Sequence, residues 1–383
     1  SFSEKEISLA LTGKFFYDLN VRNYVEKDFF YWINFKEFSD ELAKNWQSTF
    51  GLLKAYDFSN IGNDFLKDIY QGMVDPKDRH DLGEHYTPDW LCEKIVTEAL
   101  DKWDKEEAPR IADITCGSGS FLRIAIKLLR EKFFSKNDQK HKIINYITKK
   151  VIGFEIHPLA AFIAKTNYML AMEDLLPEAE EPFNIPIYLC DSLLNSELDK
   201  MDMEKRTKFA VQLAGKKFEL PQVEALTDDR FDNLIDYLDD LSHHYKAGEL
   251  PDEKINSLLT AKISEFLPED DPKHLELLES ATRLIKVLHE KVLNHENTVW
   301  AFVLKNNFRP IVFNNSIDII VGNPPWLTLK DVKNAEYRKE LEDLGLKQHK
   351  IAPVSGKLRA SMELATIFLA HAVDSYLKKN GNL

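Results

Sequence analysis

The sequence predicts an α/β protein built on a parallel sheet, and two observations support this fold class. Between residues 81 and 193, short apolar runs rich in β-branched residues alternate with longer helical patterns, as in parallel strands joined by crossover helices. A further run of this kind, Ile317–Gly322, follows after a gap of roughly 125 residues. The sheet is therefore expected to resume after a long insertion.

The elements are expected in a definite order. Residues 1–80 lack strand alternation and carry clustered aromatic residues, so we expect an N-terminal helical domain with those aromatics in its core. Residues 81–193 are expected to form the first part of the sheet. The predicted strands there are 110–113, 151–156 and 185–190, with one helix from 121 to about 134 and another that ends near residue 172.

Residues 194–315 are expected to form a mainly helical insertion. Residues 208–213 and 216–220, joined by Ala214-Gly215, have the pattern of a hairpin. Farther on, apolar residues recur every three or four positions along one helix face: Leu278, Ala281, Ile285, Leu288 and Val292.

Residues 316–383 are expected to continue the sheet. The Ile317–Gly322 strand precedes a predicted helix over residues 361–379, and residues 380–383 begin a turn. Four strands and a helix without a following strand predict a sheet that is incomplete at the C-terminus. We therefore expect a fragment of a larger protein, in agreement with Ser1 in place of an initiator Met.

Length and composition limit the class of protein. The chain has 383 residues, and no apolar stretch approaches the roughly 18 residues that a membrane-spanning helix needs. The sequence does not show the basic stretch followed by an apolar stretch that is typical of a secretory signal, so we expect no such signal. Cys92, Cys116 and Cys190 are scattered without zinc-binding spacing, and His157 and His243-His244 lack partners for a metal. We expect a reducing, cytoplasmic location, no disulfide framework and no metal site.

Charge is unevenly distributed along the chain. The net charge of −13 argues against a large nucleic-acid footprint, and residues 192–316, with 16 basic and 23 acidic residues, carry over half of it. Residues 330–359 reverse the balance, with five acidic residues and eight basic ones: Lys330, Lys333, Arg338, Lys339, Lys347, Lys350, Lys357 and Arg359. We interpret this segment first as a solvated helix and loop.

Asn323-Pro324-Pro325-Trp326 directly follows the last predicted strand. A strand cannot continue through two prolines, so the chain leaves the sheet at Asn323 in a stiff, extended turn. The carboxyl ends of strands are where open α/β sheets place their ligands. This turn offers an amide, a backbone carbonyl that no strand needs and an indole ring, which suit a planar base that carries an amino group.

A glycine loop joins the first strand to its helix, over the consecutive residues Asp113, Ile114, Thr115, Cys116, Gly117, Ser118, Gly119, Ser120 and Phe121. Its two glycines allow a ligand to approach the backbone closely, and the helix N-terminus offers N–H groups. The loop lacks a third glycine and a Lys-Ser/Thr ending, so neither NAD nor a nucleoside triphosphate fits it well.

Acidic residues also end the next two predicted strands. Glu155, followed by Ile156, is placed to accept hydrogen bonds from two ribose hydroxyls. Asp191, followed by Ser192, can accept one from an adenine amino group. With Asp113, three acids end three successive strands at one edge of the sheet, which indicates a nucleoside site.

Together these motifs resemble the S-adenosylmethionine-dependent amino-methyltransferases, and most closely the adenine-N6 DNA methyltransferases of restriction-modification systems. Asp113–Phe121 is similar to the family's cofactor loop, and Asn323–Trp326 to its Asn-Pro-Pro-aromatic catalytic motif. Glu155 and Asp191 resemble its ribose-binding and adenine-binding acids. Gly83–Pro88 resembles its Gly-x-x-Tyr-Thr-Pro element, which closes over the methionine part of the cofactor and discriminates this group from glutamine and ribosomal-RNA methyltransferases.

The resemblance implies a Rossmann-like methyltransferase sheet, S-adenosyl-L-methionine as the cofactor and a flipped adenine in double-stranded DNA as the substrate. The implied cofactor-binding residues are Tyr86, Thr87, Pro88, Asp113, Thr115, Cys116, Gly117, Ser118, Gly119, Phe121, Glu155, Ile156, Asp191 and Ser192, and the implied catalytic residues are Asn323, Pro324, Pro325 and Trp326. In the implied mechanism, the Asn323 side-chain carbonyl and the Pro324 backbone carbonyl accept the N6 hydrogens while Trp326 stacks on the base.

The sequence departs from the family pattern in three places. Trp326 stands where Tyr or Phe is more usual, which changes the stacking area, and Ile114 replaces a common Pro. The long insertion is acidic, so we interpret it as a helical spacer or protein-contact module. A DNA-recognition domain would then lie outside this chain.

Two alternatives stay open from the sequence alone. One is methylation of RNA or of a protein amide, and the other is a methyltransferase-like module that binds without turnover. The acidic charge and the missing recognition domain favour the module. The intact Asn323 and Pro324 and the complete set of cofactor acids favour an enzyme.

Overall fold

The computed structural model describes residues 86–135, 138–193, 208–213, 216–221, 229–244, 251–294, 300–353 and 355–383, with residues 13–25 and a few single positions before residue 73. The chain forms two compact units, one of residues 1–193 and 313–383 and one of residues 194–312. Most of the helical domain predicted for residues 1–80 lies outside the described residues. Within that range, η1 (Lys14–Leu19) is a 3-10 helix.

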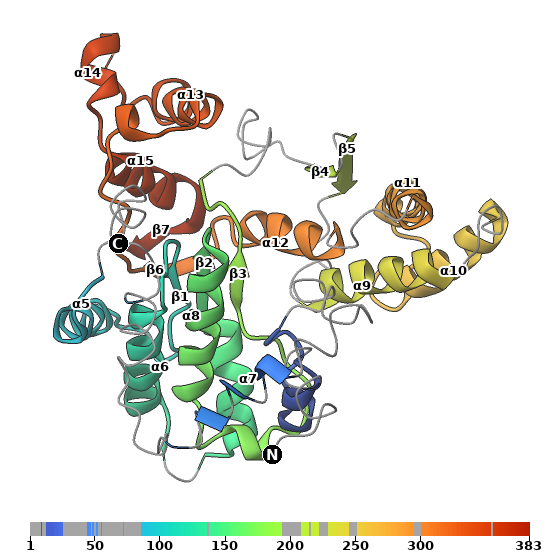
Figure 1. The fold of residues 1–383 in the computed structure, drawn as a ribbon, viewed down its shortest axis with the longest axis horizontal. Helices are drawn as coiled ribbons and strands as arrows, with labels where there is room; N and C mark the ends of the chain where they lie inside the picture. Colours follow the sequence, from blue (N-terminus) through green and yellow to red (C-terminus); the bar gives the residue numbers. More distant parts are fainter. Residues whose placement is uncertain are drawn as a thin grey trace. The chain divides into compact units, whose positions relative to one another are not determined.

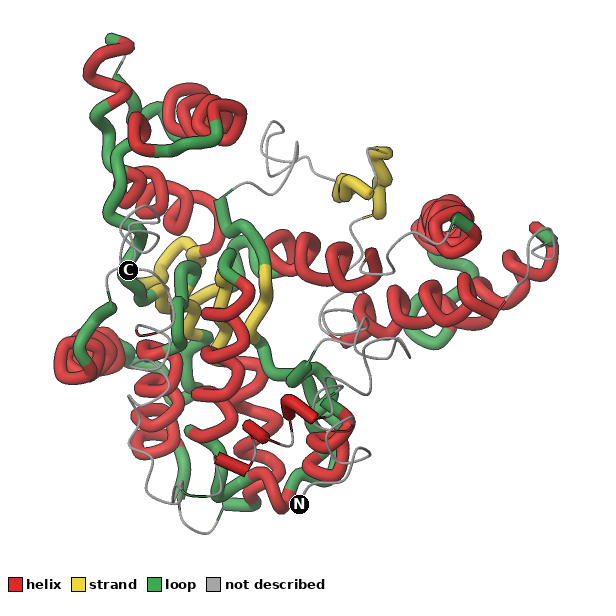
Figure 2. The backbone as a smooth tube through the Cα atoms, viewed as in Figure 1, coloured by secondary structure: helices red, strands yellow, loops and turns green. Residues whose placement is uncertain are grey.

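The first unit is built on a five-stranded parallel sheet in the order β3-β2-β1-β6-β7 (Figures 1 and 2). Its strands are β1 (Ile111–Asp113), β2 (Val151–Glu155), β3 (Ile187–Leu189), β6 (Ile317–Ile320) and β7 (Leu377–Asn382). β1, β2 and β6 are buried along their whole length, which explains their continuous apolar runs. The predicted α/β, Rossmann-like fold class is confirmed.

Helices connect and cover these strands (Figure 1). α5 (Asp89–Asp101) packs on α6 (Ser120–Phe133), which follows β1, and α7 (Lys140–Lys150) precedes β2. α8 (Pro158–Leu170) joins β2 to the short 3-10 helix η3 (Leu176–Glu178) before β3. The buried apolar faces of α5, α6, α7 and α8 form one core with the strands, and this core fixes the carboxyl edge of the sheet.

The C-terminal residues differ from the prediction. α15 (Leu364–His371) continues only through a π-helical turn, η9 (Ala372–Tyr376), and the last residues form β7, parallel to β6. The predicted helix over residues 361–379 was therefore too long, and the prediction of four strands with none to follow was wrong. The reason is that β7 is an edge strand whose Lys378, Lys379 and Asn380 are exposed, so it carries no apolar pattern.

A helical segment lies between β6 and α15. It contains η7 (Leu329–Asp331), α13 (Ala335–Asp343), the π-helical turn η8 (Leu344–Gln348) and α14 (Gly356–Ala360). Thr328 and Asp331 form a capping box at the start of η7, and Thr328 also bridges to Glu363 just before α15. The beginning and the end of the segment are thereby joined beside the sheet.

The second unit contains the hairpin strands β4 (Lys208–Leu213) and β5 (Lys216–Pro221), and the helices α9 (Asp229–His244), α10 (Asp252–Ser264), α11 (Pro272–Leu293) and α12 (Trp300–Val312). The predicted hairpin is confirmed, because β4 and β5 pair antiparallel. The predicted apolar helix face falls on α11, where Ala281, Ile285 and Leu288 are buried in a core that belongs to this unit.

The described residues contain neither a candidate membrane span nor a candidate metal site. No helix there is long and apolar enough to cross a membrane. No group of His, Cys, Asp and Glu side chains in the same residues has the arrangement of a metal site.

Candidate functional site

The candidate site lies where the order of the strands reverses. From β1 the chain proceeds to β2 and β3 on one side, whereas β6 and β7 lie on the other side. Open α/β sheets bind ligands in the crevice at such a switch point. The carboxyl ends of β1 and β6 are direct neighbours, since the N–H of Val321 donates to the carbonyl of Ala112 at 2.9 Å.

A cavity of about 720 Å³ opens at this edge, a size usual for small-molecule sites. Its lining includes these residues predicted from the sequence: Tyr86, Thr87, Asp113, Thr115, Cys116, Gly117, Ser118, Phe121, Glu155, Ile156, Asp191, Ser192, Asn323 and Pro325. Pro88, Gly119, Pro324 and Trp326 are not among the lining residues. Residues that precede the insertion in the sequence and residues that follow it thus line the same cavity.

The glycine loop after β1 has a conformation that needs its glycines. Gly117 and Gly119 have φ angles of +53° and +81°, in the left-handed region that favours glycine. The N–H of Cys116 donates to the carbonyl of Phe154 at 2.9 Å, which ties the loop to β2. A Cβ on Gly119 would lie 3.2 Å from Ala164 of α8, so this glycine permits close helix packing and lies away from the cavity.

Glu155, at the end of β2, holds the glycine loop in place. Its carboxylate accepts from the N–H of Gly117 at 2.7 Å and from the N–H of His157 at 2.8 Å. The side chain is nearly buried and lines the cavity. Glu155 therefore both shapes the loop and presents carboxylate oxygen to the cavity.

Asp113, at the end of β1, is buried beneath the cavity. Its Oδ1 accepts from the N–H of Thr115 at 3.0 Å, whereas Oδ2 has no hydrogen-bond partner in the described part of the chain. Burial, with a smaller contribution from the charge of Glu155, raises the pKa of the Asp113 carboxyl to about 7. A buried acceptor without a partner is costly, and here it belongs to a residue that lines the cavity.

Asp191, after β3, is joined to a residue that sequence reasoning missed. Its Oδ1 accepts from the N–H of Leu193 at 2.8 Å, and its carboxylate is hydrogen-bonded by the hydroxyl of Tyr337 on α13. Burial and then the charge of Asp191 raise the pKa of the Tyr337 hydroxyl well above its usual value. No local pattern around Tyr337 marks it, because only the position of α13 brings it to the cavity.

Four further apolar side chains form another part of the cavity wall. Leu327 and Val332 come from the residues around η7, and Leu364 and Phe368 come from α15. The N–H of Leu364 donates to the carbonyl of Leu327 at 2.8 Å, which holds the two parts together. None of these four residues was predicted from the sequence to be part of the site.

The Asn323–Trp326 turn has an internal hydrogen bond. The indole Nε1–H of Trp326 donates to Oδ1 of Asn323 at 2.7 Å. Asn323 lines the cavity, whereas the Trp326 ring is 65% exposed. Gly322 precedes the turn, and a Cβ there would lie 2.6 Å from Oδ1 of Asp113, so a larger residue would displace one of the two groups.

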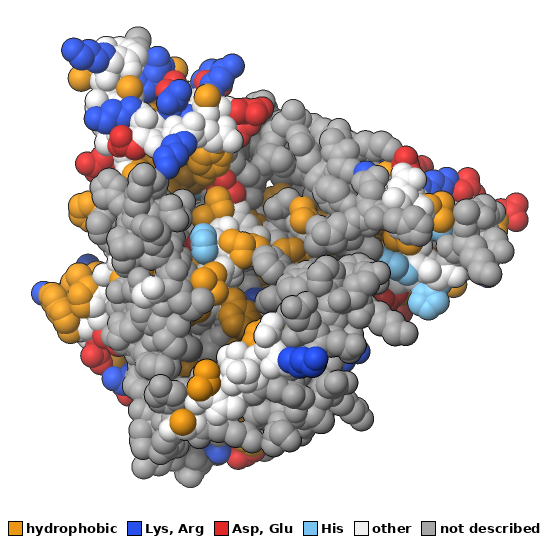
Figure 3. Space-filling model, in the orientation of Figure 1, with side chains coloured by type: hydrophobic (Ala, Val, Ile, Leu, Met, Phe, Trp, Pro, Cys, Tyr) orange, Lys and Arg blue, Asp and Glu red, His pale blue; other side chains and the backbone are white. Residues whose placement is uncertain are grey.

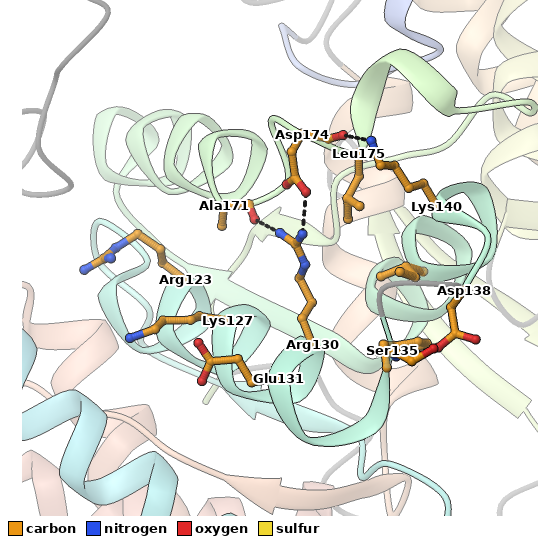
Figure 4. Close-up of a pocket in the computed structure, with 12 residues that line it drawn as sticks. Arg123, Lys127, Arg130, Glu131, Ser135, Asp138, Lys140, Ala171, Asp174 and Leu175 are labelled. Atoms are coloured by element: carbon orange, nitrogen blue, oxygen red, sulfur yellow. Dashed lines mark hydrogen bonds and ion pairs between the residues drawn. The ribbon is translucent and has the colours of Figure 1, made fainter.

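A second cavity, of about 660 Å³, is lined by residues from α6 and from the parts of the chain around α7 and after α8 (Figure 4). Basic side chains there are engaged by protein oxygens. Arg130 donates to Asp174 at 2.6 Å and to the carbonyl of Ala171 at 3.0 Å, and Lys140 donates to the carbonyl of Asp174 at 3.0 Å. These contacts suit a structural ion-pair network rather than an anion site.

The parallel sheet, with a glycine loop, strand-end acids and an Asn-Pro-Pro-Trp turn around one cavity, defines a class, the Rossmann-like methyltransferases. Comparison with protein-family models agrees: the N-6 DNA methylase model matches residues 62–220, and the Eco57I restriction-modification methylase model matches residues 149–383. The second match covers more than half of the chain, so the protein belongs to the Eco57I restriction-modification methylase family. A search of curated proteins found no match.

The family assignment settles the class of reaction and substrate. The protein is a DNA methyltransferase that methylates adenine in restriction-modification, as predicted from the sequence motifs. The alternatives of RNA or protein-amide methylation and of a non-catalytic module are not supported by either match.

Proposed function

We propose that the 720 Å³ cavity binds S-adenosyl-L-methionine and that the Asn323–Trp326 turn presents the N6 amino group of a flipped adenine to its methyl group. The observation that carries this proposal is the meeting of the glycine loop, three strand-end acids and Asn323 around one cavity. The proposal assigns two neighbouring places at the switch point of the sheet, one for the cofactor and one for the base.

The donors and acceptors of the cavity fit this cofactor. Asp113, with its partnerless Oδ2, suits the ammonium group of the methionine part. Glu155 suits the ribose hydroxyls, and Asp191, held by Tyr337, suits the adenine amino group. Tyr86 lies near the glycine loop, since a Cβ on Gly117 would be 3.8 Å from its ring. When bound, the cofactor supplies an electrophilic methyl group on a sulfonium centre.

The turn would activate the amino group by orientation and electrostatics. The N6 lone pair is delocalised into the adenine ring, so the nitrogen is a poor nucleophile. Hydrogen bonds from N6 to Oδ1 of Asn323 and to the carbonyl of Pro324 would draw the nitrogen towards a tetrahedral shape and localise the lone pair. The N–C bond forms as the C–S bond breaks, sulfur keeps the electron pair, and one N6 proton leaves to solvent.

The exposed ring of Trp326 supplies the stacking surface. Enzymes that modify a base must take it out of the duplex, and stacking on an aromatic ring contributes roughly 1–3 kcal/mol per base. Trp326 is 65% exposed beside Asn323, so its ring is accessible to a base from outside the cavity.

Residues 330–359 would contact the phosphates that flank the flipped base. The segment begins just after the turn, and Lys330, Lys339, Lys350 and Lys357 are exposed in it. Figure 3 shows Lys and Arg side chains gathered over the part of the molecule that Figure 1 labels α13 and α14. We propose this role in place of the first interpretation of the segment as only a solvated helix and loop.

Two wider assignments follow the same reasoning. A restriction-modification methylase acts on the DNA of its own cell, so we place the protein in the cytoplasm. The acidic residues 194–312 suit a spacer or a protein contact better than a DNA-recognition surface.

Asn323→Ala tests the catalytic assignment. Loss of one preorganised polar contact should lower the rate of methyl transfer by about 10²–10³. Calorimetric binding of S-adenosylmethionine should be unchanged, because Asn323 is assigned to the base. Asn145→Ala on α7 is the matched control and should alter neither quantity. Turnover near that of the wild type in Asn323→Ala would contradict the assignment.

A further inference from the structure

The aromatic residue of the turn is a tryptophan, and this choice adds a hydrogen-bond donor beside Asn323. The indole Nε1–H of Trp326 donates to Oδ1 of Asn323 at 2.7 Å. A phenylalanine ring has no such donor, and the hydroxyl of a tyrosine lies at the far end of its ring. The departure from the more usual Tyr or Phe therefore changes hydrogen bonding as well as stacking area.

The hydrogen bond determines which way the Asn323 amide faces. The two ends of a carboxamide have nearly the same shape, but the indole N–H is only a donor and can be satisfied only by the oxygen. Rotating the amide by half a turn would place its NH₂ group against the indole N–H. Because a carboxamide oxygen can accept two hydrogen bonds, the indole and an adenine amino group can both donate to Oδ1.

The backbone between the two residues keeps this geometry. Pro324 and Pro325 separate Asn323 from Trp326, and each proline fixes its φ angle. The pair is three residues apart and is held by the turn itself. Little conformational freedom remains to be lost when the hydrogen bond forms, so the amide is preorganised before DNA binds.

We propose that Trp326 is a positioning residue for Asn323: its indole N–H holds the amide with Oδ1 directed for the N6 amino group, in addition to the stacking role of the ring. This inference rests on the proposed function, in which Asn323 accepts a hydrogen bond from the target adenine. It predicts that the N–H of Trp326 and its ring contribute separately to catalysis.

Trp326→Phe separates the two contributions, because it removes the N–H and keeps an aromatic ring. Single-turnover methyl transfer at saturating DNA and cofactor should slow by about 3- to 10-fold, the value of one net hydrogen bond. The KM for DNA should change little. Trp326→Ala removes the ring as well, and should raise the KM for DNA in addition to slowing the reaction.

A double-mutant cycle shows whether Trp326 acts through Asn323. Trp326→Phe should slow the reaction in the wild-type background and cause no further loss in the Asn323→Ala background. Trp90→Phe is the matched control, since Trp90 on α5 is 67% exposed. It should change no rate in either background.

Three results would overturn the inference. An equal loss from Trp326→Phe in both backgrounds would show that the indole acts independently of Asn323, while the assignment of Asn323 stands. A rate for Trp326→Phe equal to or above that of the wild type would show that the N–H does not support catalysis. Normal turnover of Asn323→Ala would remove both the inference and the catalytic assignment on which it rests.

Discussion

Asp113 is a buried acid whose protonation differs strongly from that of an aspartate in water. It is buried, it ends β1 directly beneath the cavity, and its Oδ2 has no partner among the described residues. Burial raises the pKa of its carboxyl to about 7. Because the folded value exceeds the unfolded one, the contribution of Asp113 to stability is full below pH 3.8 and is lost as the pH rises through about 7.

The same shift predicts a pH dependence of cofactor binding. In the proposed site, ionised Asp113 would attract the ammonium group of S-adenosylmethionine, so affinity should rise by about tenfold between pH 5.5 and 7, as the carboxyl loses its proton. The α-amino group of the ligand stays protonated over this range. Calorimetric titrations of the wild type and of Asp113→Asn at both pH values measure the effect.

Asp113→Asn should bind more weakly at pH 7 and show no rise over this range, because an amide does not ionise there. Asp138→Asn, at an exposed position that does not line this cavity, serves as the control and should keep the profile of the wild type. An unchanged pH profile in Asp113→Asn would remove Asp113 from the cofactor site.

Among the elements, the buried strands and their terminal motifs could be predicted, whereas elements defined by tertiary position could not. β1, β2 and β6 are covered on both faces, so burial favours apolar residues at successive positions of each strand, and these form a run in the sequence. The strand-end acids and the glycine loop are local features, and the parallel sheet brings them to one edge. Their spacing therefore predicted most of the cavity lining.

β7 and Tyr337 show why the rest was missed. β7 lies at the sheet edge and exposes lysines, so its sequence resembles a loop. Tyr337 reaches Asp191 only because α13 is placed beside the cavity, and its neighbours in the sequence give no sign of this. The hydrogen bond between Trp326 and Asn323 also required coordinates, although the tryptophan was visible as a departure from the family pattern.

The basic segment around α13 and α14 gives a prediction for DNA binding. Lys339 and Lys350 are exposed, and reversing both charges should remove two phosphate contacts. The Lys339→Glu/Lys350→Glu variant should bind DNA at least tenfold more weakly at low salt, and the salt slope of log K should fall by about 2. The rate at saturating DNA should change little, because neither lysine lines the cavity.

A matched reversal controls for net charge. Lys142→Glu/Lys149→Glu, on exposed positions of α7, changes the total charge by the same amount. It should leave DNA affinity and its salt slope near the wild-type values. If the two double variants weakened DNA binding equally, DNA affinity would depend on net charge alone and residues 330–359 would not be a DNA-binding surface.

At the scale of the whole molecule, total charge proved a poor guide to the substrate. The chain has a net charge of −13, yet it belongs to a DNA methylase family. Over half of the acidic excess falls in residues 192–316, and nearly all of those residues form a unit with its own core. The cavity is built entirely by the other unit, from residues on both sides of the insertion.

We propose above that this cavity and turn transfer a methyl group from S-adenosylmethionine to N6 of adenine. The most direct test is to incubate the protein with DNA and cofactor labelled in its methyl group, digest the DNA and identify the labelled nucleoside by mass spectrometry. The wild type should yield labelled N6-methyladenine, and Asn323→Ala should yield about 10²–10³ less of it at equal times. Label on cytosine, or equal N6-methyladenine from both proteins, would contradict the claim.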